Sequence, residues 1–266
     1  MPMTNMEEMH KKFRQSQDNG FTVFEDGVFT VLFNENKNQS RMLNLPVNFV
    51  YVHSSDGRFL IDLGLGNFPH KMFKRKSRTP FYTHPQHLLG KGIRPDSIDG
   101  IILSHMHIDH IGGYGNHDSE QFIPFYPNVP CFVQKKEWDF RAEKYDKAEQ
   151  AYKNTMDGLQ KNIRLIDGNR EIANGIDVVL TGGHTPGHQI IFFSTNKRKV
   201  CYAGDIISTE NQAVDGRALP HDYDRTTSKK VRDALIDQAR SQNWIFIYSH
   251  AAHIKAGRLE STEKNE

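Results

Sequence analysis

Residues 104–113 contain the densest group of potential metal ligands in the chain. Four side chains with nitrogen or oxygen donors lie close together there: His105, His107, Asp109 and His110. Imidazole nitrogens and carboxylate oxygens are common ligands of zinc and of other divalent metals. In a helix of about 3.6 residues per turn His105 and His107 would point apart, whereas an extended turn can direct both imidazoles to one ion. The spacing therefore indicates a metal-binding loop.

Short apolar runs lead into the ligand-type side chains. Ile101–Leu103 precedes the first group and is typical of a buried strand, and Gly112-Gly113 after the group allows the backbone to turn. Later in the chain, apolar runs end at His184, Asp205 and His250. The ends of strands in two packed sheets can converge at one edge, so we expect these donors to lie near the first group.

The ligand set is larger than one ion needs. Three neutral imidazoles with an open fourth position are the pattern of a catalytic rather than a structural zinc site. The additional donors indicate two ions that share a carboxylate, and Asp205 is the natural bridge because a carboxylate offers two oxygens. No cysteine lies in the set, so it suits two divalent ions, with Zn²⁺ as the first expectation and Mn²⁺ or Fe²⁺ as alternatives.

The composition is that of a globular protein. The chain has 266 residues, 37% of them hydrophobic and 25% charged, so we expect a single domain over 1–266 with two β-rich halves, roughly 21–165 and 166–258. The net charge of +2 does not favour nucleic acid or an anionic membrane as a partner. Cys131 and Cys201 are too few for a disulfide framework, and the chain has neither a signal-peptide core nor a run of ~20 apolar residues. We expect a cytoplasmic protein that acts on a small-molecule substrate; its oligomeric state stays open, with a homodimer as one option.

Hydrophobic periodicity and turn residues predict a chain rich in strands. Residues 1–20 should form a short helix or a loose arm, and the last eight residues should fray. Between them we expect hairpins over 21–33, around Asp26-Gly27, and over 47–62; paired strands over 171–180; strands over 131–133, 189–194, 199–203 and 244–248; and helices over 84–89, 135–153 and 228–240.

Two loops have two interpretations each. Residues 67–81 are rich in Lys and Arg and form either a solvated loop, which we favour, or a patch for acidic substrates. Residues 114–130 carry several aromatic side chains, which form either a substrate wall beside the ligands or ordinary packing.

The ordered set of motifs closely resembles the metallo-β-lactamase superfamily. The matching residues are His105-Met-His107-Ile-Asp109-His110, a distant His184, Asp205 after Ala-Gly, and His250. The resemblance implies an α/β fold, an αββα sandwich of two mixed sheets with helices on the outer faces and a binuclear metal site at one edge. It also implies a division of the ligands, with the first metal held by His105, His107 and His184, the second held by Asp109, His110 and His250, and Asp205 bridging them.

Other residues take supporting roles or none in this resemblance. Asp62 is expected to steady the ligand loop through hydrogen bonds. His188 lies in a stretch similar to the family's usual turn and is expected to be a structural histidine near the ligands. His117, His221 and His253 match no metal position, so we expect them to be exposed or hydrogen-bonded histidines.

The resemblance further implies a metal-dependent hydrolase. Two ions can share a hydroxide that attacks a lactone or ester carbonyl, and Asp109 would both ligate metal and orient that hydroxide. Aspartate rather than cysteine at position 205 is similar to lactonases, hydroxyacylglutathione hydrolases, ribonuclease Z and organophosphate hydrolases. Residues 88–99 and 221–224 resemble the N-acyl homoserine lactonase and organophosphate hydrolase branch. A quorum-quenching lactonase is therefore the first expectation.

One position departs from the lactonase pattern. Lactonases of this family often carry a tyrosine three residues after the bridging aspartate, where this chain has Ser208. A thioesterase of the hydroxyacylglutathione type and an organophosphate hydrolase therefore stay as alternatives. A nuclease of the same superfamily and a non-catalytic metal-binding protein are less favoured alternatives. The modest charge argues against a nuclease, and the open coordination positions argue against a non-catalytic protein.

Overall fold

Two β-sheets form the centre of the structure. The computed structural model describes residues 21–36, 39–69, 73–75, 84–118, 121–195, 198–216 and 219–259. The first sheet has seven strands in the order β4-β1-β2-β3-β5-β8-β9. Its strands are β1 (Phe21–Asn36), β2 (Gln39–Ser54), β3 (Gly57–Ile61), β4 (Phe73–Arg75), β5 (Gly100–Ile102), β8 (Cys131–Gln134) and β9 (Ile163–Ile166).

The second sheet has six strands in chain order, from β10 to β15. They are β10 (Arg170–Ala173), β11 (Ile176–Leu180), β12 (Gln189–Thr195), β13 (Arg198–Tyr202), β14 (Ile245–Ile247) and β15 (Ala256–Arg258). Both sheets are mixed, since β3, β5, β8 and β9 pair in parallel in the first and β13 pairs in parallel with β14 in the second. A small additional pair joins β6 (Gly115–Asn116) to β7 (Ile123–Pro124).

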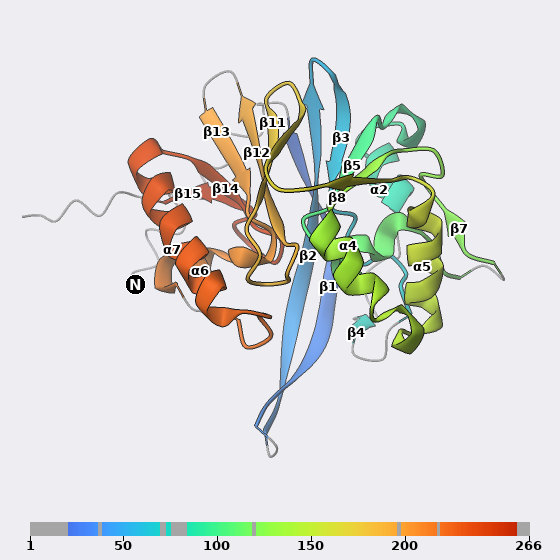
Figure 1. Ribbon diagram of the computed structural model, residues 1–266, viewed down its shortest axis with the longest axis horizontal. Coiled ribbons are helices and arrows are strands. Elements are labelled where there is room, and N and C mark those ends of the chain that lie inside the picture. The colour runs from blue at the N-terminus through green and yellow to red at the C-terminus, as the bar shows by residue number, and fades with distance from the viewer. Residues whose placement is uncertain are drawn as a thin grey trace, which may run out of the picture.

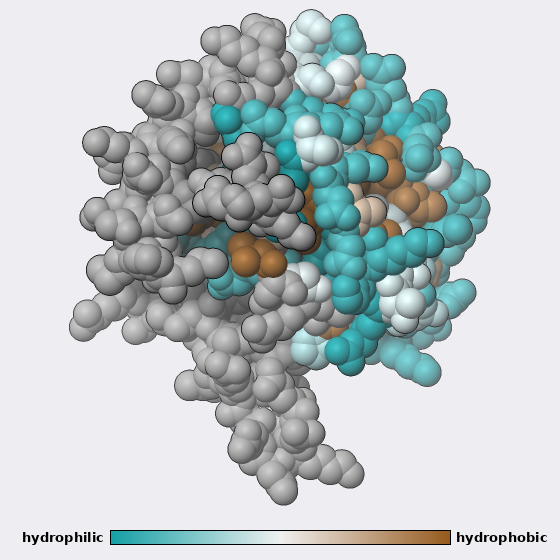
Figure 2. Space-filling view, turned by 90° about the vertical axis from the view of Figure 1, so that its left-hand side faces the viewer, coloured by the Kyte–Doolittle hydropathy of each residue, from teal (hydrophilic) through white to brown (hydrophobic). Residues whose placement is uncertain are grey.

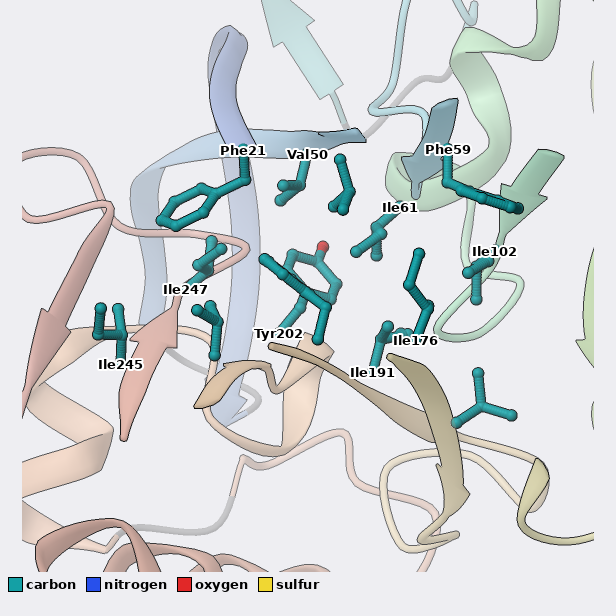
Figure 3. Packing of buried hydrophobic residues seen from close by; sticks show 14 of the residues in the cluster. Phe21, Val50, Phe59, Ile61, Ile102, Ile176, Ile191, Tyr202, Ile245 and Ile247 are labelled. Atoms are coloured by element: carbon teal, nitrogen blue, oxygen red, sulfur yellow. The ribbon is translucent and has the colours of Figure 1, made fainter. Parts of the chain in front are cut away.

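Apolar side chains fill the space between the two sheets (Figure 3). Val50 and Ile61 of the first sheet and Ile191 and Tyr202 of the second belong to one buried cluster. Alternate residues along a strand point to opposite faces of its sheet, so each strand of this layer contributes every second side chain. Burial of this apolar surface holds the two sheets face to face.

Helices cover the outer face of each sheet (Figure 1). On the first sheet, α2 (His84–Leu89) and α5 (Gln150–Gln160) join a second buried cluster, and α4 (Lys135–Ala142) lies beside them. On the second sheet, α6 (Glu210–Asp215) and α7 (Arg225–Gln242) do the same in a third cluster. This arrangement confirms the predicted αββα sandwich.

Most of the predicted elements occur, and two predictions are wrong. The expected hairpin over 21–33 is a single strand, because Asp26-Gly27 is accommodated as a β-bulge opposite β2 and not as a turn. The expected helix over 135–153 is divided into α4, a 3₁₀ turn at Tyr145–Lys147 and α5. The break lets both helices lie against the same sheet, and Tyr145 ties the turn to α5 by donating a hydrogen bond to Asp157 (2.7 Å).

Both alternatives for the aromatic stretch 114–130 can be compared with the structure. Tyr114 and Tyr126 are buried in the cluster beneath α5, and Phe122 and Phe125 pack against it. These side chains therefore serve as packing. The expectations for 1–20, for most of 67–81 and for nearly all of the last eight residues lie outside the described residues.

The helices of the described residues are too short or too polar to span a membrane. On the side that carries α6 and α7, the described side chains visible in Figure 2 are mostly hydrophilic. The assignment of 1–266 to a single domain stays a prediction.

Candidate metal centre

The predicted ligands and the supporting residue Asp62 follow strands whose ends meet at one edge of the sandwich. Asp62 follows β3 and His105 lies beyond β5, while Asp205 and His250 lie beyond β13 and β14. β3 and β5 are parallel, as are β13 and β14, so within each pair the carboxyl ends lie at the same edge. The loop between the antiparallel strands β11 and β12 carries His184.

The ligand loop combines an extended segment with one helical turn. His107 has an extended backbone (φ −70°, ψ 155°) and precedes the short helix α3 (Ile108–Ile111), which contains Asp109 and His110. The glycine pair after α3 has a different role from the one predicted. A Cβ at Gly113 would lie only 2.0 Å from the carbonyl oxygen of Leu63, so glycine permits close backbone approach here.

His105, His107 and His184 converge on one point with Asp205. The Nδ1 of His107 lies 2.8 Å from the Nε2 of His105 and 3.0 Å from the Nε2 of His184. The Oδ2 of Asp205 lies 3.3 Å from the Nε2 of His184 and 3.9 Å from the Nε2 of His105. We call these four residues the first group.

Asp109, His110 and His250 form a second group next to the first. The Oδ2 of Asp109 lies 3.5 Å from the Nε2 of His250 and 3.9 Å from the Nε2 of His110. The Oδ1 of Asp205 lies 3.3 Å from the Nε2 of His110 and 3.2 Å from the Nε2 of His250. Asp205 therefore directs one oxygen toward each group.

Hydrogen bonds hold the Nε2 atoms of the second group in place. The Nδ1 of His110 donates to Asp62 Oδ2 (2.7 Å), and the Nδ1 of His250 donates to the carbonyl of Pro46 (2.8 Å). A neutral imidazole that donates through Nδ1 keeps a lone pair on Nε2, which is the atom that faces Asp205.

Asp62 connects this second group to the first. Its Oδ1 accepts from the backbone N–H of Ser104 (2.7 Å), and its Oδ2 accepts from the Ser104 hydroxyl (2.6 Å) and the Tyr202 hydroxyl (2.7 Å). Ser104 Oγ in turn lies 3.1 Å from the Nδ1 of His105. Asp62 thus forms hydrogen bonds to the ligand loop, and its φ of 55° marks a constrained backbone at the end of β3.

His188 lies behind the first group. Its Nε2 accepts from the backbone N–H of Asp205 (3.2 Å), and its Nδ1 lies 2.8 Å from the Thr181 hydroxyl. The hydroxyl of Ser249 donates to Asp205 Oδ1 (2.9 Å). These contacts fix the carboxylate of Asp205 between the two groups.

Two carboxylates near the site were not singled out in the sequence. Asp222 Oδ1 accepts from the Nδ1 of His184 (2.8 Å), and its Oδ2 faces Arg232 at 3.7 Å. Glu137, fully buried on α4, accepts from the backbone N–H groups of Met106 (2.9 Å) and Gly187 (3.3 Å). Glu137 has no local pattern, and Asp222 was noted only as part of the stretch 221–224, so the role of each in holding a histidine loop is evident only from its position in the fold.

The structure also gives the positions of Ser208, His117 and His221. Ser208 is buried, and its hydroxyl donates to Gln212 Oε1 (2.8 Å). His117 lies 3.4 Å from the hydroxyl of Thr155, apart from both ligand groups. His221, for which no role was expected, has its ring 5.3 Å from the ring of His184.

Histidines of the two groups differ in the direction in which their pKa values are shifted. Burial, followed by the neighbouring imidazoles, lowers the pKa of His105 and of His107 well below the usual value, which keeps both neutral. Burial also acts to lower the pKa of His110, but Asp205, Asp62 and Asp109 outweigh it and raise that pKa well above the usual value. The carboxylates therefore create a negative potential that favours a cation at the second group.

The donor set fits divalent metal ions. Neutral imidazoles and carboxylates are the ligands that zinc, manganese and iron accept in proteins. The Nε2 of His110 is buried and makes no hydrogen bond within the described residues, as expected of an atom directed at a ligand. Each group brings at least three such atoms close together.

Comparisons with known proteins agree with this geometry. The N-acyl homoserine lactonase of Bacillus thuringiensis is 27% identical over 169 residues, which cover 59% of this chain and 62% of that protein. The chain thus spans somewhat less than two thirds of this curated relative. The lactonase of Bacillus cereus is 28% identical over 167 residues, covering 59% of this chain and 61% of the relative.

Solved structures share the fold at lower identity. An N-acyl homoserine lactone hydrolase with N-hexanoyl-L-homoserine bound at its catalytic metal centre has a TM-score of 0.67 and 23% identity, covering 88% of this chain and 93% of that one. A probable metal-dependent hydrolase from Staphylococcus aureus has a TM-score of 0.75 and 19% identity, covering 93% and 95%. The family model of the metallo-beta-lactamase superfamily matches residues 43–250, which include every predicted ligand. With this match and the sandwich fold, the chain belongs to the metallo-beta-lactamase superfamily.

Proposed function

We propose that the protein is a binuclear metal-dependent hydrolase of small lactones or esters. The observation that carries the proposal is the position of Asp205, whose Oδ2 faces His184 and whose Oδ1 faces His110 and His250. A carboxylate in this position suits a bridge between two ions. The lactonases of Bacillus among its relatives support a lactone as the substrate.

The two groups define two coordination sites in this proposal. The first ion would be held by His105, His107 and His184, the second by Asp109, His110 and His250, and both by Asp205. When bound, two divalent ions supply a water of lowered pKa and polarise a carbonyl oxygen. Zn²⁺ is the expected ion, because three imidazoles with an open position are typical of catalytic zinc.

Several of the chain's own residues support the reaction. Asp109 has a side chain that is 11% exposed, and it can accept a hydrogen bond from the attacking water and so orient it toward a substrate carbonyl. Asp62 and Asp222 hold His110 and His184 in the tautomer that keeps Nε2 available. Ser208 is turned toward Gln212, so a phenol equivalent to the lactonase tyrosine is not supplied from this position.

A substrate panel tests the proposal directly. Protein of measured zinc content is assayed against an N-acyl homoserine lactone, an aryl ester, a thioester and an aryl phosphotriester, with Asp205→Ala as the matched variant. We expect lactone or aryl ester hydrolysis that disappears in Asp205→Ala together with a lower metal content per chain. A preference for the thioester or the phosphotriester would favour those activities instead, and a zinc-loaded protein inactive on all four would refute the hydrolase proposal.

Two further expectations accompany the proposal. The free cysteines Cys131 and Cys201 are both buried, which fits a reducing compartment and hence the cytoplasm. A homodimer is compatible with the proposed chemistry, because all the proposed ligands come from one chain.

A further inference from the structure

Arg141, on α4, is a largely buried cation next to the first group. Its side chain is 12% exposed, and its Nε donates to Glu137 Oε1 at 3.1 Å. The same carboxylate oxygen also accepts the backbone N–H of Met106. Glu137 therefore uses only one of the five N–H donors of the guanidinium, and the Nη2 of Arg141 is buried and makes no hydrogen bond within the described residues.

Arg141 is linked through Glu137 to the loop segment on the more exposed side of the first group. Met106, which shares the Glu137 carboxylate with Arg141, lies between His105 and His107. His107 is the least buried member of the first group. Through the shared oxygen of Glu137, the guanidinium is therefore held next to the loop segment that carries His107.

The surroundings of Arg141 join α4 to the loop before α7. The ring of Phe140 packs edge to face against the exposed ring of Tyr223 at 5.3 Å, and the backbone N–H of Tyr223 donates to the carbonyl of His184. Just beyond the C-terminal end of α4, the Nζ of Lys144 lies 3.6 Å from the centre of the Phe140 ring. Arg141 and Lys144 thus both lie near the ring of Phe140, which contacts Tyr223 beside the His184 loop.

A structural role as the counter-ion of Glu137 does not account for the unused N–H donors of Arg141. A buried donor without an acceptor is destabilising, and more so when the group is charged. The planar fork of arginine matches the two oxygens of a carboxylate and binds them more strongly than neutral donors would.

We propose that Arg141 recognises a carboxylate on the substrate, so that the preferred lactones or esters carry an additional acidic group. This inference rests on the proposed hydrolase function and specifies its substrate class. Arg141 would bind the acidic group beside His107, with Glu137 holding the guanidinium in place from behind.

A matched pair of esters tests this inference. The para-nitrophenyl monoester of glutarate and para-nitrophenyl pentanoate share the leaving group and the chain length, and differ by one terminal carboxylate. We expect the wild type to prefer the glutarate ester, and Arg141→Gln to lower the ratio of the two kcat/KM values about tenfold, mainly through KM. Lys135→Gln is the control, since Lys135 is an exposed cation on the same helix that pairs with Asp139, and it should leave the ratio unchanged.

The outcomes separate recognition from a structural role. If the wild type hydrolyses both esters equally well, or if Arg141→Gln weakens both to the same extent with a loss of bound zinc, the inference is wrong. If neither ester is hydrolysed, the substrate panel described above decides whether the proposed function fails, and calorimetric titration with glutarate still tests the site. Weaker binding of glutarate to Arg141→Gln than to the wild type would then support carboxylate recognition, and equal binding would overturn it.

Discussion

At the scale of single residues, the metal centre depends on carboxylates that hold histidines. Asp62 orients His110, and Asp222 orients His184, in each case by accepting a hydrogen bond from Nδ1. The partner of a ligating histidine fixes its tautomer and its ring orientation. Asp62 also accepts from the ligand loop and from Tyr202, whereas Asp222 is shared with Arg232.

Substitution of Asp222 measures this orienting role. We expect Asp222→Ala to weaken zinc binding about 10- to 100-fold, because the Nδ1 of His184 loses its acceptor. Asp222→Asn should have a smaller effect, since the amide oxygen can still accept. Affinity is measured by competition with a chelator, and Asp233→Ala, an exposed aspartate on α7, serves as the control. Wild-type affinity in both Asp222 variants would contradict the assignment.

Glu137 shows how one residue can serve two loops. Its carboxylate binds the backbone at Met106, in the loop of His105 and His107, and at Gly187, in the loop of His184. A Cβ at Gly187 would lie 2.1 Å from the backbone nitrogen of Glu137, so that loop lies directly against α4. Arg141 also donates a hydrogen bond to this carboxylate. The buried charge of Glu137 therefore positions both loops and the guanidinium that we propose binds the substrate.

At the scale of elements, close contact between two turns positions the ligand loop. The backbone N–H of Gly113 donates to the carbonyl of Gly64 (3.0 Å), and the N–H of Leu63 donates to the carbonyl of His110 (2.8 Å). The turn after β3 and the end of α3 are thus held together by their backbones. Side chains larger than hydrogen do not fit between them.

The substitution Gly113→Ala tests the need for this contact. Its Cβ would lie 2.0 Å from the carbonyl oxygen of Leu63, so one of the two turns must move. We expect a loss of at least about 2 kcal/mol in the free energy of unfolding, together with weaker zinc binding. The matched control is Gly90→Ala, where the added Cβ would meet only the carbonyl oxygens of Gln86 and His87, at 3.4 and 3.5 Å. Urea unfolding of the two variants gives the comparison, and equal stabilities would contradict the steric argument.

At the scale of the whole molecule, the metal centre joins the two sheets. His105, His107, Asp109 and His110 follow β5 of the first sheet, whereas His184, Asp205 and His250 are carried by the second. The backbone of Asn48 on β2 also donates to the carbonyl of Ser249, beside His250 (2.8 Å). Ions bound between these segments would therefore link the halves of the sandwich.

Removal of the metal should lower the stability of the whole sandwich. A ligand that binds only the folded state adds about 4 kcal/mol when its concentration is a thousand times its Kd. We expect a chelator to lower the thermal midpoint of the zinc-loaded protein, and zinc to restore it in a concentration-dependent way. Asp205→Ala should show a smaller shift because it retains less metal. A midpoint that does not respond to chelation, in protein known to contain zinc, would contradict a linking role.

Some features of this protein are determined locally and could be predicted from the sequence. The alternation in β11, the apolar face of α7 and the spacing of His105, His107 and Asp109 are short-range patterns, and each corresponds to an observed element or to close ligand positions. The αββα sandwich was expected from the resemblance of the ordered metal motifs to the metallo-β-lactamase superfamily. The hairpin predicted at Asp26-Gly27 was wrong because this dipeptide suits either a turn or a β-bulge. Pairing with β2, which the local sequence does not specify, decides between the two.

Tertiary structure alone decided which distant groups meet. Glu137 is a single acidic residue without a motif, and Asp222 lies in a resembling stretch that gave it no role; they reach the histidine loops only because α4 and the loop before α7 pack where they do. The same holds for Arg141, which is linked to the ligand loop at Met106 through Glu137 because α4 packs next to that loop. Sequence spacing indicated metal-binding chemistry, because four of the seven predicted ligands, His105, His107, Asp109 and His110, occur in a short local pattern. The groups that orient those ligands, and the cation proposed to select the substrate, depend on contacts between segments far apart in the chain.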